Sequence, residues 1–301
     1  MKTGINFLGK SFKNPIITAS GTFGSGAEYA ELIDLNRLGG LTTKGVADVP
    51  WPGNPTPRVC EVRSGMLNAI GLQNPGIDTF IKRDLKFLEG HDTNVVVNVC
   101  GHSEDEYVRV VDALANQERA DILEINISCP NVKEGGIAFG TDPKMVEKIT
   151  KVIKAHATQP VVMKLSPNVT DITETAKAAE AGGADGVSLI NTLTGMKIDI
   201  ERQTFAIANK TGGMSGPAVH PIAVRMVYQV ANAVSIPIIG MGGVETAEDA
   251  IELMLAGASL VSVGTANFYN PNATLDIIDG IEKYLERKGI EDINSIIGAV
   301  K

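Results

Sequence analysis

Short apolar, β-branched segments recur along nearly the whole chain and alternate with stretches of helical pattern, which restricts the fold to repeated βα units around a parallel sheet. Eight segments read as strands, each too short for a buried helix and most of them followed by helix-start signals. They are "PIITAS" at Pro15, "GLTTKG" at Gly40, "NVVVNVC" at Asn94, "DILEINIS" at Asp121, "PVVMKLS" at Pro160, "DGVSLINT" at Asp185, "IPIIGMGG" at Ile236 and "SLVSVGTA" at Ser259.

Helix signals lie between these segments. Ser103 and Glu106 predict a capping box, and Asp142 with Pro143 predicts a capped start with a first-turn proline. Thr246 predicts the start of a helix that ends at the glycine in "LAGASLVSVG". The chain therefore has the helix, glycine, strand order of βα repeats.

Eight strands alternating with helices favour a (β/α)8 TIM barrel over an open doubly wound sheet, and no GxGxxG motif follows the first strand. We expect residues 1–301 to form a single barrel domain. The stretch "INFLGKSFKNP" predicts a short N-terminal hairpin that turns at Gly9 and plugs the bottom of the barrel. Long inserts follow strand 2 (residues 46–77) and strand 6 (from Asn191 to Pro221), and both should cover the active-site face.

Composition excludes several classes of function. The net charge of -8, with no basic run, disfavours a nucleic-acid partner. No signal peptide and no apolar run near the ~20 residues needed to cross a bilayer can be read, so we expect no membrane association and a cytoplasmic location. The three cysteines form no CxxC pair and no cluster with the four histidines, so no metal site, iron-sulfur centre or disulfide is predicted.

Polar residues stand where most of the strands end. Because these ends meet on one rim of a barrel, the polar residues should form one site. They are Ser20, Lys44, Asn98, Asn126, Cys129, Lys164, Asn191, Gly242, Gly243, Gly264 and Thr265.

The last two loops, "GMGGVE" and "VGTANF", combine glycines with backbone N–H groups ahead of helices, which suits a phosphate. Tight turns with capping glycines are the plainer interpretation. Lys44 and Lys164 end apolar runs, and a buried lysine is costly without an anionic partner. Each can bind a phosphate, a carboxylate or the developing charge of a reduced ring, form a Schiff base, or extend to solvent at the barrel mouth.

The asparagines at positions 68, 126, 131 and 191 offer donors and acceptors without charge, as needed to read a flat ligand with amide groups, although asparagine also favours turns. Cys129 precedes a proline in a polar loop that contains glycines, where a thiol can meet a substrate. Cys60 and Cys100 read as small apolar residues.

With these residues, the chain resembles the class 1 dihydroorotate dehydrogenases, flavin enzymes of pyrimidine biosynthesis, and in particular the catalytic subunit of subclass B. The resemblance covers essentially the whole chain. Its most specific motifs are "NISCPNV" from Asn126, "GMLNAIGLQNPG" from Gly65, "GMGGV" from Gly240 and "VGTA" from Val263.

The resemblance implies FMN as the cofactor and dihydroorotate as the substrate. Carried over by matching position, the implied FMN contacts are Ser20, Lys44, Gly45, Asn98, Asn126, Lys164, Ile190, Gly216, Gly242, Gly243, Gly264 and Thr265. The implied substrate contacts are Lys44, Asn68, Ala69, Ile70, Gly71, Leu72, Asn126, Asn131, Asn191 and Thr192.

The resemblance also implies the chemistry. Oxidation to orotate removes a proton from carbon 5 and a hydride from carbon 6, and Cys129 matches the family's base. Class 2 enzymes carry serine there and an N-terminal membrane-associating extension, and this sequence shows neither feature.

"NPTPRVCE" and "NAIGLQNPG" resemble subclass B, which passes electrons to NAD through a second subunit carrying FAD and a 2Fe-2S cluster. A homodimer of this chain within a heterotetramer is implied. The competing functions are those of the fumarate-using subclass A, a Schiff-base lyase on a phosphate-binding barrel, and a flavin-binding scaffold without activity.

Overall fold

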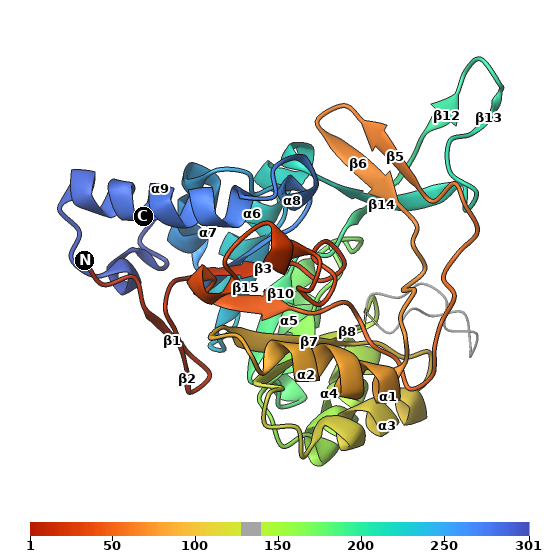
Figure 1. The fold of residues 1–301 in the computed structure, drawn as a ribbon, viewed down its shortest axis with the longest axis horizontal. Coiled ribbons are helices and arrows are strands. Elements are labelled where there is room, and N and C mark those ends of the chain that lie inside the picture. Colours follow the sequence, from red (N-terminus) through yellow and green to blue (C-terminus); the bar gives the residue numbers. More distant parts are fainter. Residues whose placement is uncertain (128–139, 301) are drawn as a thin grey trace.

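The computed structural model describes residues 1–127 and 140–300, and its centre is a closed parallel barrel (Figure 1). All eight predicted segments form its strands. In chain order the strands are β3 (Ile16–Thr18), β4 (Gly40–Thr42), β7 (Asn94–Val99), β8 (Ile122–Asn126), β9 (Val161–Lys164), β10 (Gly186–Leu189), β15 (Ile238–Met241) and β16 (Leu260–Val263). Each strand pairs with the next in this order, and β16 closes the barrel on β3, so the predicted TIM barrel is confirmed.

Helices surround the barrel. They are α3 (Glu104–Leu114), α4 (Pro143–His156), α5 (Ile172–Ala181), α6 (His220–Ala231), α7 (Ala247–Ala256), α8 (Ala266–Tyr269) and α9 (Ala273–Lys288). Before β7, α1 (Ile77–Thr79), a π-helical segment (Phe80–Leu85) and α2 (Lys86–Leu88) follow one another without a break. Short 3-10 turns occupy Tyr29–Glu31, Leu35–Arg37, Pro217–Val219 and Ile293–Ile296.

The core lies inside the barrel and between its strands and helices. Every residue of β8, β9, β10, β15 and β16 is buried, which explains why these strands read as continuous apolar runs rather than alternating ones. The helices present one apolar stripe inward; in α3 the buried residues are Tyr107, Val110, Val111 and Leu114.

The predicted helix starts are observed, with one difference. Asp142 accepts the amide of Lys144 at α4, and Thr246 forms a reciprocal capping box with Asp249 at α7. At α3, Ser103 accepts the amide of Glu106, as predicted. The carboxylate of Glu106, however, accepts the amide of His102 at 2.6 Å, one residue before the N-cap, so the capping box predicted here is not reciprocal.

The N-terminal hairpin pairs β1 (Ile5–Phe7) with β2 (Lys10–Phe12). Its two turn residues, Leu8 and Gly9, have φ angles of 53° and 79°, as a tight hairpin turn requires. Phe7 and Phe12 are buried, and Lys10 pairs with Asp121 just before β8 begins. The hairpin therefore lies at the N-terminal end of the barrel strands.

The two inserts combine into one antiparallel sheet, which the sequence did not predict. Its order is β11 (Leu193–Met196), β14 (Thr211–Ser215), β6 (Gly65–Asn68) and β5 (Val59–Val62). A separate ribbon joins β12 (Ile198–Asp199) to β13 (Thr204–Phe205). In Figure 1 these strands lie on the right, away from the N-terminal hairpin. They follow the C-terminal ends of β4 and β10, so the inserts stand over the face predicted to hold the site.

In the described part of the chain, no helix is both long and apolar enough to cross a membrane. Among the same residues, no group of three or more His, Cys, Asp or Glu side chains could hold a metal ion.

Candidate active site

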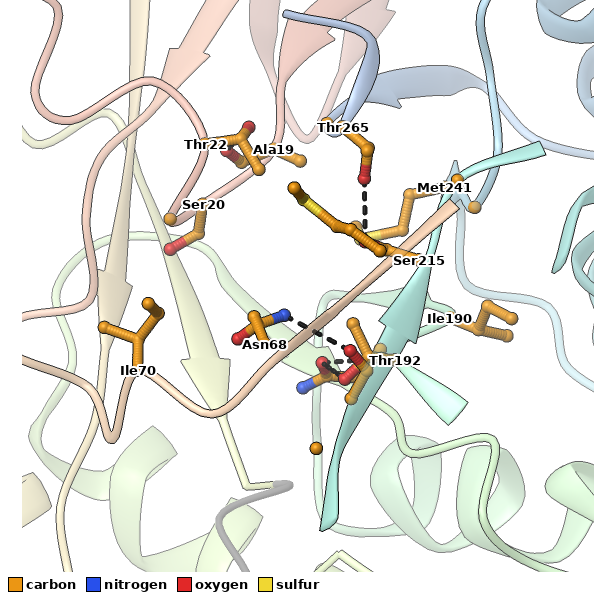
Figure 2. A pocket seen from close by; sticks show the side chains of 18 of the residues that line it. Ala19, Ser20, Thr22, Asn68, Ile70, Ile190, Thr192, Ser215, Met241 and Thr265 are labelled. Carbon is orange, nitrogen blue, oxygen red and sulfur yellow. Dashed lines mark hydrogen bonds between the residues drawn. The ribbon is translucent and has the colours of Figure 1, made fainter. Parts of the chain in front are cut away.

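A cavity of about 700 Å³ lies between the C-terminal rim of the barrel and the insert sheet. Figure 2 shows the side chains that reach it, among them Ser20 near β3, Asn68 from β6 and Thr265 after β16. The predicted site residues that line it are Ser20, Lys44, Asn68, Ala69, Ile70, Gly71, Leu72, Asn126, Lys164, Ile190, Asn191, Thr192, Gly216, Gly242, Gly243, Gly264 and Thr265. Residues predicted from separate parts of the chain thus meet around one space of the size usual for a cofactor with its substrate.

Two predicted residues that the structure describes are absent from this lining, and two others are not described. Gly45 and Asn98 are buried behind the cavity wall, where a Cβ on Gly45 would come within 2.7 Å of Asn98 Oδ1. Their direct contact with a cofactor therefore stays a prediction. Cys129 and Asn131 lie outside the described residues.

A buried carboxylate, Glu124 of β8, lies behind the cavity lysine. Its Oε2 accepts from Asn98 Nδ2 at 2.6 Å and from Lys164 Nζ at 3.3 Å, and its Oε1 accepts from Ser188 Oγ at 2.8 Å. The four side chains come from four adjacent strands, β7 to β10, and each residue is at most 6% exposed. Lys164 thus has an anionic partner of its own, which fixes the ammonium group at the cavity wall.

Lys44 follows β4 and faces a different environment. Burial lowers the pKa of its ammonium group, and the nearby charges of Lys164 and Arg58 lower it further, whereas the Cys100 thiol opposes them. Lys44 and Lys164 both line the cavity, and the repulsion between their like charges lowers the tendency of Lys44 to stay charged. An anion placed between them would relieve this repulsion.

The glycine loop after β15 packs so tightly against neighbouring residues that there is no room for a side chain at Gly242 or Gly243. Gly242 and Gly243 have φ angles of 131° and 68°, a region that glycine alone adopts readily. A Cβ on Gly243 would lie 2.7 Å from the carbonyl oxygen of Gly216. Within residues 1–127 and 140–300, no backbone group accepts a hydrogen bond from the amide of Gly243 or of Gly264. These amides are available to an anionic ligand.

The insert sheet adds polar groups to the opposite wall. Ser215, at the end of β14, accepts a hydrogen bond from Thr265 Oγ1 at 2.8 Å, and this bond links the insert to the last glycine loop (Figure 2). Asn191 Nδ2 lies 3.4 Å from Asn126 Oδ1. The side-chain oxygen of Asn191 accepts a hydrogen bond from the backbone amide of Thr192 at 2.7 Å. Asn126 and Asn191 are thus linked directly, whereas Asn68 Nδ2 donates to the carbonyl oxygen of Gly213 at 3.4 Å.

Sequence reasoning missed several of these residues. Glu124 carried a usable signal, because it is an acidic residue inside an otherwise apolar strand, as Lys164 is a basic one. Ser215 lines the cavity as well, but its segment read only as part of a long loop. Nothing local in a sequence indicates that two inserts far apart will pair.

Comparison with known proteins agrees with this geometry. The family model described as dihydroorotate dehydrogenase matches residues 3–285. A protein of Lachnoclostridium phytofermentans is 68% identical over 301 residues, covering 100% of both chains. One of Alkaliphilus oremlandii is 58% identical over 295 residues, covering 98% of this chain and 97% of the relative. One of Caldicellulosiruptor bescii is 50% identical over 300 residues, covering 100% and 99%. All three are named dihydroorotate dehydrogenase B (NAD(+)), catalytic subunit.

Proposed function

Because the chain belongs to the dihydroorotate dehydrogenase family, we propose that it oxidises dihydroorotate to orotate in pyrimidine biosynthesis and passes the electrons on toward NAD. The observation that carries this proposal is the full-length identity of 68% to a relative named for that activity. The lining of the cavity supports it, because most of the residues that the resemblance assigns to cofactor and substrate meet there.

The residues present fit FMN. The phosphate would lie at Gly242, Gly243, Gly264 and Thr265. Close packing excludes side chains at Gly242 and Gly243, and the amides of Gly243 and Gly264 meet no backbone acceptor among the described residues. The ring would lie toward Lys164, whose ammonium group is fixed by Glu124. When bound, FMN supplies a two-electron acceptor for the hydride that leaves carbon 6 of the substrate.

Dihydroorotate would be held between Lys44 and the asparagines that line the cavity. Lys44 supplies a positive charge for the carboxylate of the substrate, and Asn68, Asn126 and Asn191 offer donors and acceptors to its amide edges. We propose Cys129 as the base that removes the carbon 5 proton. In the sequence, Cys129 comes three residues after Asn126, the last residue of β8.

The cofactor proposal has a spectroscopic test. Purified protein, or apo-protein reconstituted with FMN, should be yellow, and anaerobic dihydroorotate should bleach the flavin band without NAD. Riboflavin added in place of FMN is the control for the contribution of the phosphate to binding. Protein that takes up no FMN, or FMN that dihydroorotate fails to bleach, would contradict the proposal.

We further propose a partner subunit that carries FAD and a 2Fe-2S cluster, bound to a homodimer of this chain within a heterotetramer. The relatives' names call each of them a catalytic subunit, and the three cysteines of this chain form no cluster motif for iron and sulfur. The pure chain should therefore reduce artificial acceptors but not NAD. Steady-state oxidation of dihydroorotate with NAD or fumarate as acceptor tests this. Fast NAD reduction by the chain alone would show that no partner subunit is required, and fast fumarate reduction would indicate subclass A.

One competing function loses support, and another can be tested directly. A Schiff-base lyase would use Lys44 or Lys164, but family membership and the ion pair of Lys164 with Glu124 both disfavour it. An inactive flavin-binding scaffold would stay yellow with dihydroorotate. A cytoplasmic location and a single domain over residues 1–301 stay predictions from the sequence.

A further inference from the structure

His220 contacts the glycine loop after β15 and lies outside the cavity lining. It is the first residue of α6, and it is 7% exposed. Its Nδ1 lies 2.8 Å from the carbonyl oxygen of Gly242. Because a carbonyl oxygen only accepts, Nδ1 must carry the hydrogen and donate it. No step of the proposed reaction uses this imidazole.

The hydrogen bond from His220 determines the direction of the next amide. In a planar trans peptide the C=O and N–H groups point in opposite directions. A Gly242 carbonyl held toward His220 therefore directs the N–H of Gly243 away from the ring, toward the cavity that Gly243 lines. That is one of the amides that meets no backbone acceptor in the described ranges, 1–127 and 140–300.

The ring of His220 is itself held by α7. Its Nε2 lies 3.2 Å from Glu252 Oε2 and 3.7 Å from Asp249 Oδ1. The other oxygen of Asp249 accepts the amides of Glu245 and Thr246, which fixes the carboxylate at the start of α7. The imidazole thus bridges α7 and the loop that precedes it.

The loop also packs directly on the start of α6. A Cβ on Gly243 would lie 2.8 Å from His220 Cβ and 2.9 Å from His220 N, so the two backbones approach as closely as glycine allows. A loop that carries two glycines is otherwise free to adopt many conformations. The hydrogen bond to Gly242 selects one of them.

We propose that His220 is a positioning residue for the phosphate of FMN: it holds the Gly242–Gly243 peptide so that the Gly243 N–H faces the phosphate oxygens. The inference rests on the proposed function, because it takes FMN as the ligand and this loop as its phosphate site. Riboflavin has the same ring and sugar alcohol but no phosphate. The contribution of His220 must therefore appear with FMN and vanish with riboflavin.

The test measures dissociation constants of FMN and riboflavin for the full-length apo-chain by quenching of flavin fluorescence. Three variants are compared with the wild type. His220→Phe removes both ring nitrogens, His220→Gln carries an amide near the position of Nε2, and His220→Asn carries one near the position of Nδ1. The first two should weaken FMN binding about tenfold, the effect expected from the loss of one well-placed hydrogen bond. His220→Asn should stay within about threefold of the wild type.

Riboflavin affinity decides between positioning and general damage. It should change by less than about twofold in all three variants, since the phosphate loop is not engaged. Equal losses for both flavins, or full FMN affinity in His220→Phe, would overturn the proposal. If the wild-type chain binds neither flavin, the proposal that FMN is the cofactor is itself wrong.

A measurement on the wild-type chain tests the proposal even if the variants fail to fold. Isotope-labelled histidine reports the nitrogen chemical shifts of His220 in the FMN-loaded and the riboflavin-loaded chain. The shift of Nδ1 should differ between the two, because the phosphate polarises the peptide whose carbonyl His220 holds. Identical shifts in the two forms would overturn the inference.

Discussion

Replacing Cys129 by serine is expected to leave FMN bound and to slow reduction of the flavin by dihydroorotate by several orders of magnitude near neutral pH. The reason is the acidity of the base. A free thiol ionises with a pKa of about 8.5, whereas a serine hydroxyl is far harder to deprotonate, so it removes the carbon 5 proton much more slowly. Stopped-flow absorbance of the flavin band under anaerobic conditions measures this step directly.

The pH profile and a second cysteine complete this experiment. Flavin reduction in Cys129→Ser should recover partly as the pH rises, because a larger fraction of the weak base is then ionised. Cys60→Ser is the matched control, since Cys60 lies in β5 of the insert sheet and outside the cavity lining. A wild-type rate in Cys129→Ser combined with an inactive Cys60→Ser would show that Cys129 is not the base.

The barrel could be predicted because each βα unit carries its signals locally. The strands are apolar runs, and the helices begin at side-chain caps such as Asp142 and Thr246. In contrast, the insert sheet depends on pairing between β6 and β14, which lie more than a hundred residues apart and contain three glycines between them. Such pairing leaves no local pattern, because the sheet is specified by contacts across the barrel mouth.

Nine of the lining residues, among them Lys44, Asn126 and Lys164, were predicted because strand ends meet on one rim. Others, such as Ile70, Ile190 and Gly216, followed only from the resemblance. The groups that orient the lining were missed, because their partners come from other strands and helices. Glu124 acts on Lys164 across the strand pair β8–β9, and His220 reaches the glycine loop from α6. Spacing along the chain predicts which residues reach a site, but not which buried partners hold them in place.

Because Glu124 is buried, its replacement should have a large effect on the free energy of unfolding. Glu124→Leu is expected to destabilise the apo-chain by about 3–5 kcal/mol, because the buried Lys164 would lose its ion pair with this carboxylate. Asn98 Nδ2 and Ser188 Oγ would lose their acceptor as well. Urea denaturation followed by circular dichroism gives the change in the free energy of unfolding.

A double-mutant cycle separates the effect of the Glu124–Lys164 ion pair on stability from the effect of side-chain packing. Lys164→Met alone should also destabilise, since it leaves the carboxylate buried without its cation, whereas Glu124→Leu combined with Lys164→Met should recover much of the loss. The exposed pair of Glu147 and Lys151 on α4 is the matched control, where Glu147→Leu should cost less than about 1 kcal/mol. Simple addition of the two losses in the double variant would contradict this account. The stability would then depend on the separate hydrogen bonds and packing of each side chain, and the ammonium group at the cavity wall would not need the carboxylate behind it.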